Sequence, residues 1–99
     1  MDKNSYISAT EFEIAGGFER RGGQLKPNAN SLRIAELRCR LLQKIAASAE
    51  HFSVLYRDPN DGRYWELFSQ NPEGHGGGSK SLVFISDNEA KVKYQLDEN

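Results

Sequence analysis

The sequence predicts a small α+β domain: mainly antiparallel β-sheet, with one longer helix near residues 30–41 and a short C-terminal helix near residues 87–95. Three observations lead to this prediction. Two runs rich in aromatic and branched residues flank a turn at 58–62, which is typical of a β-hairpin. Apolar residues recur at helical spacing after Asn30. A chain of 99 residues, finally, has room for one modest core, so residues 1–99 are expected to form a single domain.

The N-terminal third is punctuated by glycine. The first ten residues are polar and are expected to be loosely ordered, although "YISATEFEI" alternates well enough for a short strand. In "GGFERRGGQLKP", Gly22 and Gly23 could reverse the chain between two short strands, before Pro27 and Asn28 break the pattern.

The predicted longer helix begins at a cap, either Asn30 or Ser31. One face of a 3.6-residue period then carries Ile34, Leu37, Leu41, Leu42 and Ile45. The solvent side is expected to hold Arg33, Glu36, Arg38, Arg40 and Lys44. Where this helix ends is left open by the pattern, because "LLQKIA" could continue it or become a strand over residues 42–47.

The turn at 58–62 has the residues that a hairpin needs. Pro59 fixes φ at the second position of a type I turn, Asp58 can accept a backbone N–H, and Gly62 tolerates a left-handed conformation. In the strand that follows, one face is predicted to carry Arg63, Trp65 and Leu67, and the other Tyr64, Glu66 and Phe68. Residues 82–85, "LVFI", suit a strand buried on both faces, and Ser86 or Asp87 begins the last helix.

Composition and charge limit the classes of function. At 37% hydrophobic and 27% charged residues, the chain is typical of a soluble globular domain without a membrane span. Cys39 is the only cysteine and the start lacks a secretion signal, so a cytoplasmic location is expected. Residues 1–50 have a charge balance of +2 and residues 51–99 of −3. A phosphate-binding protein usually has a strong basic excess, so direct nucleic-acid binding is not expected, whereas the acidic half could attract a basic protein.

Two glycine-rich patterns imitate catalytic motifs without their context. "GHGGGSKS" differs from a phosphate-binding loop because Ser79 replaces the second glycine and a strand, not a helix, follows. "HGGG" resembles the oxyanion loop of lipases, but the chain has no G-x-S-x-G elbow. A glycine loop between two strands is the preferred interpretation.

Some carboxylates, both histidines and the cysteine are residue types that can bind metal ions. Asp58, Asp61 and Glu66 could form a metal-dependent hydrolase site, but Phe68 stands where restriction-type nucleases have lysine, and turn geometry explains both aspartates more simply. Glu66, next to Trp65 on a central strand, needs a partner: an arginine of its own chain or a basic group of a ligand. No zinc spacing links Cys39, His51 and His75, so no metal or cofactor is expected.

The combination of "LYRDPNDGRYWEL" with the later "HGGG", "FIS" and "EAKVKY" resembles the immunity protein 27 family of bacterial polymorphic toxin systems. The resemblance runs from about Glu13 to Tyr94, and we call its most specific part, residues 56–67, the signature segment. The sequence departs from the family pattern at Phe68-Ser69 and at Ser79-Lys80-Ser81. The residues that carry the motif are Tyr56, Arg57, Pro59, Gly62, Arg63, Tyr64, Trp65, Gly76, Gly77 and Gly78.

The resemblance implies a non-enzymatic inhibitor. Such a protein binds and blocks the C-terminal catalytic domain of a toxin, such as a nuclease, that bacteria deliver to one another in contact-dependent growth inhibition. It implies a cytoplasmic monomer that forms a 1:1 complex, and it favours a strand for "QKIAA". Because nuclease clefts are basic, the hypothesis for the toxin-binding surface names Asp58, Asp61, Glu66, Glu73 and His75. The alternatives are a hydrolase using Asp58, Asp61 and Glu66, and a binding module unrelated to toxins.

Overall fold

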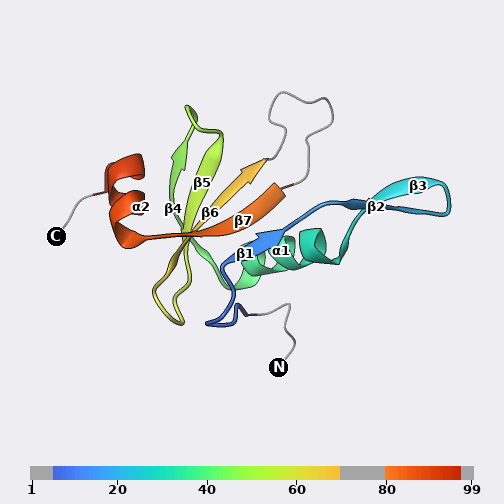
Figure 1. Cartoon of the computed structure of the whole chain (residues 1–99), viewed down its shortest axis with the longest axis horizontal. Helices are drawn as coiled ribbons and strands as arrows, with labels where there is room; N and C mark the ends of the chain where they lie inside the picture. Colours follow the sequence, from blue (N-terminus) through green and yellow to red (C-terminus); the bar gives the residue numbers. More distant parts are fainter. Residues whose placement is uncertain (1–5, 70–79, 97–99) are drawn as a thin grey trace.

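The computed structural model describes residues 6–69 and 80–96. The elements are β1 (Glu13–Ala15), β2 (Phe18–Arg21), β3 (Gln24–Pro27), α1 (Ala29–Arg40), β4 (Gln43–Ser48), β5 (Ser53–Arg57), β6 (Tyr64–Ser69), β7 (Lys80–Ile85) and α2 (Asp87–Tyr94). Five strands form one antiparallel sheet in the order β1-β7-β6-β5-β4, and β2 pairs with β3 separately (Figure 1). The predicted α+β class, the longer helix and the short C-terminal helix are confirmed. Neither α1 nor α2 is long and apolar enough to cross a membrane.

The two helices cover opposite faces of the sheet. Ile34 and Leu37 of α1 pack on a cluster that includes Trp65 and Leu82. Ala90 of α2 packs with Leu55 of β5. Leu55 precedes Tyr56, which belongs to the cluster under α1, and successive side chains of a strand point to opposite faces, so Leu55 lies on the other face. The predicted burial of β7 on both faces is confirmed, since Leu82 belongs to the first cluster and Ile85 to the second.

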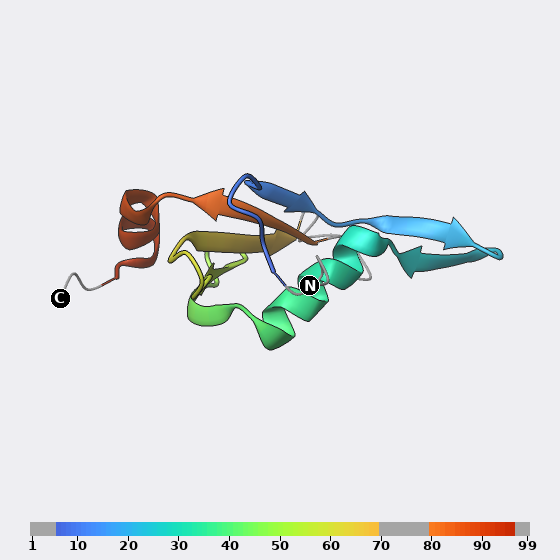
Figure 2. The same ribbon diagram turned by 90° about the horizontal axis from the view of Figure 1, so that it is seen from below.

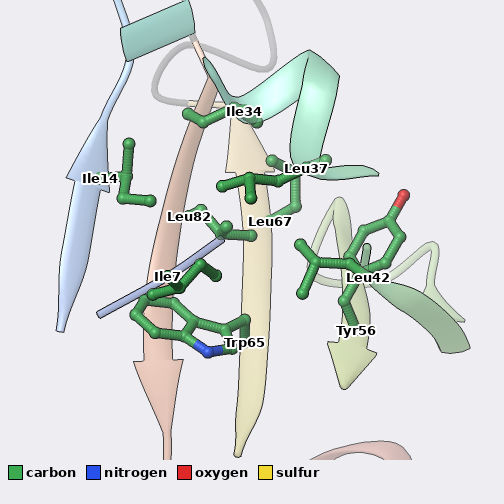
Figure 3. Packing of buried hydrophobic residues seen from close by; sticks show 9 residues of the cluster. All are labelled: Ile7, Ile14, Ile34, Leu37, Leu42, Tyr56, Trp65, Leu67 and Leu82. Carbon is green, nitrogen blue, oxygen red and sulfur yellow. The ribbon is translucent and has the colours of Figure 1, made fainter. Parts of the chain in front are cut away.

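The larger core lies between α1, the sheet and residues 6–15, which we call the N-terminal segment. Trp65, Leu37 and Leu82 have no exposed area, and the Trp65 ring makes an edge contact with Phe84 at 6.3 Å between centroids. Among the described residues, the buried side chains of this cluster are those shown in Figure 3: Ile7, Ile14, Ile34, Leu37, Leu42, Tyr56, Trp65, Leu67 and Leu82. A core of this size fits the single domain that the chain length predicted.

The ends of α1 differ from the expected ones by a few residues. Asn28 is the N-cap, and its side-chain oxygen accepts a hydrogen bond from the Ser31 backbone N–H at 2.9 Å, so neither Asn30 nor Ser31 has that role. At the other end the backbone N–H groups of Leu41 and Leu42 both donate to the Leu37 carbonyl. The chain then enters β4, which confirms the strand over "QKIAA" and excludes the longer helix.

For two residues of α1 and β4, Arg33 and Ile45, the predicted exposure to solvent is wrong. Ile45 was expected on the buried helical face, but it lies in β4 at a register shift between Lys44 and Ala46 and is exposed. Arg33 was expected in solvent, but it is buried against the N-terminal segment.

The N-terminal segment is less regular than its alternation suggested. Only residues 13–15 form a strand, and they pair with β7 at the sheet edge. Before them, the Ser8 backbone N–H donates to the Glu11 carboxylate at 2.9 Å and the Glu11 N–H donates to the Ser8 carbonyl at 3.0 Å. These local hydrogen bonds close a turn that competes with strand pairing.

The separate β2–β3 hairpin projects from the body of the molecule, at the end opposite to α2 (Figures 1 and 2). We call residues 18–27 the arm. The predicted reversal at Gly22 and Gly23 is confirmed, since both have positive φ values, 57° and 80°. Two consecutive residues with positive φ are what a type I′ hairpin turn requires, and glycine adopts them without strain.

Phe52, in the turn between β4 and β5, has a strained backbone conformation, so glycine at this position should give a more stable fold. Its φ of 54° is left-handed, a conformation that costs a bulky residue roughly 1–2 kcal/mol, and 63% of the residue is exposed. We expect Phe52→Gly to raise the free energy of unfolding by about 1 kcal/mol, as measured by urea denaturation. Phe52→Ala keeps the backbone strain and should bring no such gain. An equal gain in both variants would contradict a backbone origin.

Candidate functional site

Asp58 lies inside the hairpin turn of the signature segment. Its backbone N–H donates to the Arg63 carbonyl at 2.9 Å, its carbonyl accepts from Gly62 at 2.8 Å, and its Oδ1 accepts from the Asn60 N–H at 2.8 Å. The residue has 0% exposure. The turn geometry predicted for Asp58 is therefore present, and its side chain offers no surface to a partner.

Arg63 joins the signature segment to the N-terminal segment. Its guanidinium donates to the Glu11 carbonyl at 2.7 Å and to the Ser8 carbonyl at 2.9 Å. It also lies over the Trp65 ring, 4.9 Å from the centroid, and within 6 Å of the ring centroids of Phe12 and Phe84, a cation–π arrangement. Arg63 thus connects parts of the chain that are far apart in sequence.

Asp61, the second predicted contact residue, is the carboxylate partner of Arg63. The Arg63 Nε donates to Asp61 Oδ2 at 2.7 Å, and the Arg63 backbone N–H donates to Oδ1 at 3.0 Å. Burial acts to raise the pKa of Asp61, but the hydrogen bonds from Arg63 outweigh it and hold that pKa below its usual value. Asp61 is therefore ionised and internally paired, with part of its side chain still in solvent.

Glu66 has its expected partner within the chain. The partner is a lysine and a tyrosine of α2, not an arginine: Lys93 Nζ lies 2.6 Å from Glu66 Oε2, and the Tyr94 hydroxyl donates to the same oxygen at 2.8 Å. The Tyr94 hydroxyl also contacts Ser53 Oγ at 2.5 Å. Burial and the neighbouring Glu66 raise the pKa of Tyr94 to about 12, so the phenol stays protonated at neutral pH. Glu66 therefore ties α2 to the sheet.

The three acids do not converge. Asp58 bonds its own turn, Asp61 bonds Arg63, and Glu66 bonds α2. Within residues 6–69 and 80–96, no group of three or more His, Cys, Asp and Glu side chains could hold a metal ion. The other predicted site and motif residues Glu73, His75, Gly76, Gly77 and Gly78 lie outside the described residues.

A further ion pair, between Arg33 and Glu11, was missed from the sequence. Arg33 of α1 donates to both carboxylate oxygens of Glu11, at 2.6 and 2.7 Å, and to the Tyr6 carbonyl at 3.1 Å. The partners are 22 residues apart, so no local pattern could have indicated the pair. Together with Arg63 it holds the N-terminal segment over the core.

Glu11 should make stability depend on pH in the acid range. The hydrogen bond from Arg33 lowers the Glu11 pKa from 4.5 to about 2, against an opposing effect of burial. Because the folded-state pKa is depressed, the stabilisation is complete above about pH 5 and is lost as the pH falls towards 2. We expect Glu11→Gln to lower the free energy of unfolding by about 2 kcal/mol at pH 7 and by much less at pH 3.

Urea denaturation at pH 7, 5, 4 and 3 measures this difference. Glu50→Gln is the matched control, since Glu50 is exposed in the turn after β4. A gap between wild type and Glu11→Gln that stays constant down to pH 3 would contradict the assignment.

The arm presents the other candidate surface, which sequence reasoning identified only as two strands. Leu25 is 64% exposed and Phe18 46% exposed, and Leu32 of α1 is exposed nearby. Between the arm and α1 lies a shallow hollow lined by Glu19, Arg21, Lys26, Pro27, Ala29 and Leu32. Exposed apolar side chains on a projecting element are typical of protein–protein contact sites.

Comparison with the sequence models of known families shows to which family the chain belongs. The sequence model of the immunity protein 27 family matches residues 20–86, which include most of the arm, α1 and the strands β4 to β7. The chain belongs to the immunity protein 27 family. No curated protein and no solved structure matches the chain. The resemblance seen in the signature segment is thereby confirmed, and membership in an immunity family implies a toxin as partner in general terms.

Proposed function

We propose that this protein binds the catalytic domain of a cognate bacterial toxin and blocks it by covering the active site. The observation that carries the proposal is the family match over residues 20–86. In this proposal the protein is a non-enzymatic, cytoplasmic monomer. It forms a 1:1 complex with the C-terminal domain of a toxin, such as a nuclease, that is exchanged between bacteria in contact-dependent inhibition.

The contacts of the signature segment support a binding role. Arg63, Trp65 and Glu66 are all engaged within the chain, which makes the sheet a rigid support. Rigid interfaces lose less conformational entropy on binding, so a preorganised inhibitor can bind tightly. Asp61 and Glu66 could contact a toxin only while competing with their internal partners, so we place the main contacts on exposed side chains. Glu73 and His75 stay predictions.

Co-expression with the toxin domain encoded next to this protein tests the proposal. We expect the tagged protein to retain that domain on an affinity column and to restore growth of cells that express it. Failure of both would refute the cognate-pair proposal. Titration of Mg²⁺, Mn²⁺ and Zn²⁺ by calorimetry addresses the hydrolase alternative, which requires specific binding of at least one of these ions.

A further inference from the structure

We infer that the arm is the part of this protein that enters the toxin, and that the toxin surface it meets is acidic. The inference rests on the proposed function and adds the contact element and the chemistry of the partner. It differs from the sequence-based hypothesis, in which acids of the second half of the chain meet a basic cleft.

The base of the arm is firmly held. Ser31 of α1 accepts from the Gly17 N–H at 2.8 Å and donates to the Gly17 carbonyl at 2.7 Å, and the Asn28 N–H donates to that carbonyl at 2.9 Å. Gly16 approaches the sheet so closely that an added Cβ would lie 2.2 Å from the Lys80 carbonyl oxygen. The arm therefore leaves the body in a defined direction, as Figure 2 shows.

Beyond this base, the arm has few contacts of its own. Within the described residues, β2 and β3 pair only with each other in a two-stranded sheet, and every residue of β3 is exposed. An isolated two-stranded hairpin is marginally stable in water, and its outer edges keep unpaired backbone groups. A partner that packs on the arm would supply the missing contacts.

The two faces of the arm have different chemistry. Pairing of Phe18 with Pro27 and of Arg20 with Leu25 places these four residues on one face. The opposite face carries Glu19, Arg21 and Lys26, which line the hollow beside α1. The first face thus combines two exposed apolar side chains with one guanidinium, a composition enriched in binding sites.

The charges of the arm identify the kind of surface that fits it. The arm has three cations, Arg20, Arg21 and Lys26, and one carboxylate, Glu19, which gives a balance of +2. Arg21 is paired with Glu19 at 2.9 Å, whereas Arg20 and Lys26 form no ion pair with the described part of the chain. Arg20 lies on the apolar face and Lys26 on the opposite face, so each face of the arm presents a cation without an ion pair in the described part of the chain. Such cations call for carboxylates on the partner. Catalytic domains whose active groups or metal ligands are carboxylates offer such a cleft.

Single substitutions on the arm test the inference by calorimetry with the purified toxin domain. We expect Arg20→Glu and Lys26→Glu each to weaken binding at least about 10-fold, and Leu25→Ser to weaken it about 30-fold, the level of an interface hot spot. The matched controls are Lys44→Glu on β4 and Val92→Ser on α2, which are also exposed, and these should bind like wild type. All five variants should keep the wild-type thermal midpoint.

Each outcome has a separate meaning. If the wild type binds and the arm variants behave like the controls, the arm inference is overturned while the proposed function stands. If Arg20→Glu and Lys26→Glu bind more tightly than wild type, the partner surface is basic and the acidic assignment is overturned. If the wild type itself does not bind, the proposed function fails and the arm inference fails with it.

Discussion

Replacing Arg63 by Ala is expected to lower the free energy of unfolding by about 3 to 5 kcal/mol, a large part of the total for a domain of this size. The substitution leaves the Glu11 carbonyl without the guanidinium donor and Asp61 without its counter-charge. The Ser8 carbonyl loses one of two donors, because the Glu11 backbone N–H still donates to it. It also removes the cation that lies over the Trp65 ring. A buried carbonyl that loses its donor costs its desolvation free energy. A partly buried carboxylate that loses its counter-charge is also costly, and Arg63→Ala causes both losses.

Urea denaturation of three variants separates these contributions. Arg63→Lys keeps the charge but cannot reach two carbonyls and a carboxylate with one ammonium, so an intermediate loss is expected. Arg21→Ala is the control, because Arg21 is exposed and its pair with Glu19 lies in solvent, and it should change stability by less than about 0.5 kcal/mol. A similar small effect of Arg63→Ala would show that Arg63 does not join the two segments.

The Arg63 result also bears on immunity in the cell. Loss of protection by Arg63→Ala would come from a smaller amount of folded protein, because a destabilisation of this size raises the unfolded fraction that proteases remove. Lower growth temperature or higher expression should then restore protection. A contact residue on the arm would not be rescued in this way.

The parts of the fold that were predicted correctly are those specified by neighbouring residues. The turn at 58–62, the Gly22-Gly23 reversal and the Ser86 cap depend on side chains within a few positions of the backbone groups that they serve. Local chemistry of this kind is visible in a single sequence. The end of α1 was decided by the family resemblance, because the apolar pattern suits a helix and a strand equally well.

The parts that were missed depend on tertiary contacts. In the sequence, Arg33 looks like a solvent-facing arginine of a helix. Its partner Glu11 is distant in sequence and lies beside it only in the folded structure. Ile45 fits the helical period, but in β4 it falls at the register shift and turns out to solvent. For Glu66, the need for a partner was predicted from its place on a central strand, while the partner itself, on α2, was not.

The candidate site was predictable only in part for a related reason. The toxin-binding hypothesis named acids of the second half because they would complement a basic cleft. In the structure, Asp58, Asp61 and Glu66 instead form hydrogen bonds and ion pairs within the fold. The sequence of the arm contains no distinctive motif. The arm became a candidate because it projects from the body, which cannot be predicted from a residue pattern.

The turn of the arm allows binding to be altered without changing any side chain that we assign to the interface. We expect the double variant Gly22→Val/Gly23→Val to weaken toxin binding by about 30-fold or more and to leave the thermal midpoint of the body nearly unchanged. Both positions have positive φ, where a β-branched residue is strained by roughly 1–2 kcal/mol. A hairpin that is marginal on its own then loses its two-stranded form, and the toxin has to reorder it on binding.

Gly22→Asn is the matched control for this variant. Asn-Gly is a favoured type I′ pair, so the arm should keep its shape and its affinity despite the added side chain. An added Cβ at either glycine meets no atom within 4 Å, so any effect of valine must come from the backbone and not from a clash. Unchanged affinity in the double valine variant would mean that the shape of the arm is not used in binding. Weaker binding in that variant alone, with Gly22→Asn like wild type, would assign the contact to a preformed hairpin and not to a flexible basic segment.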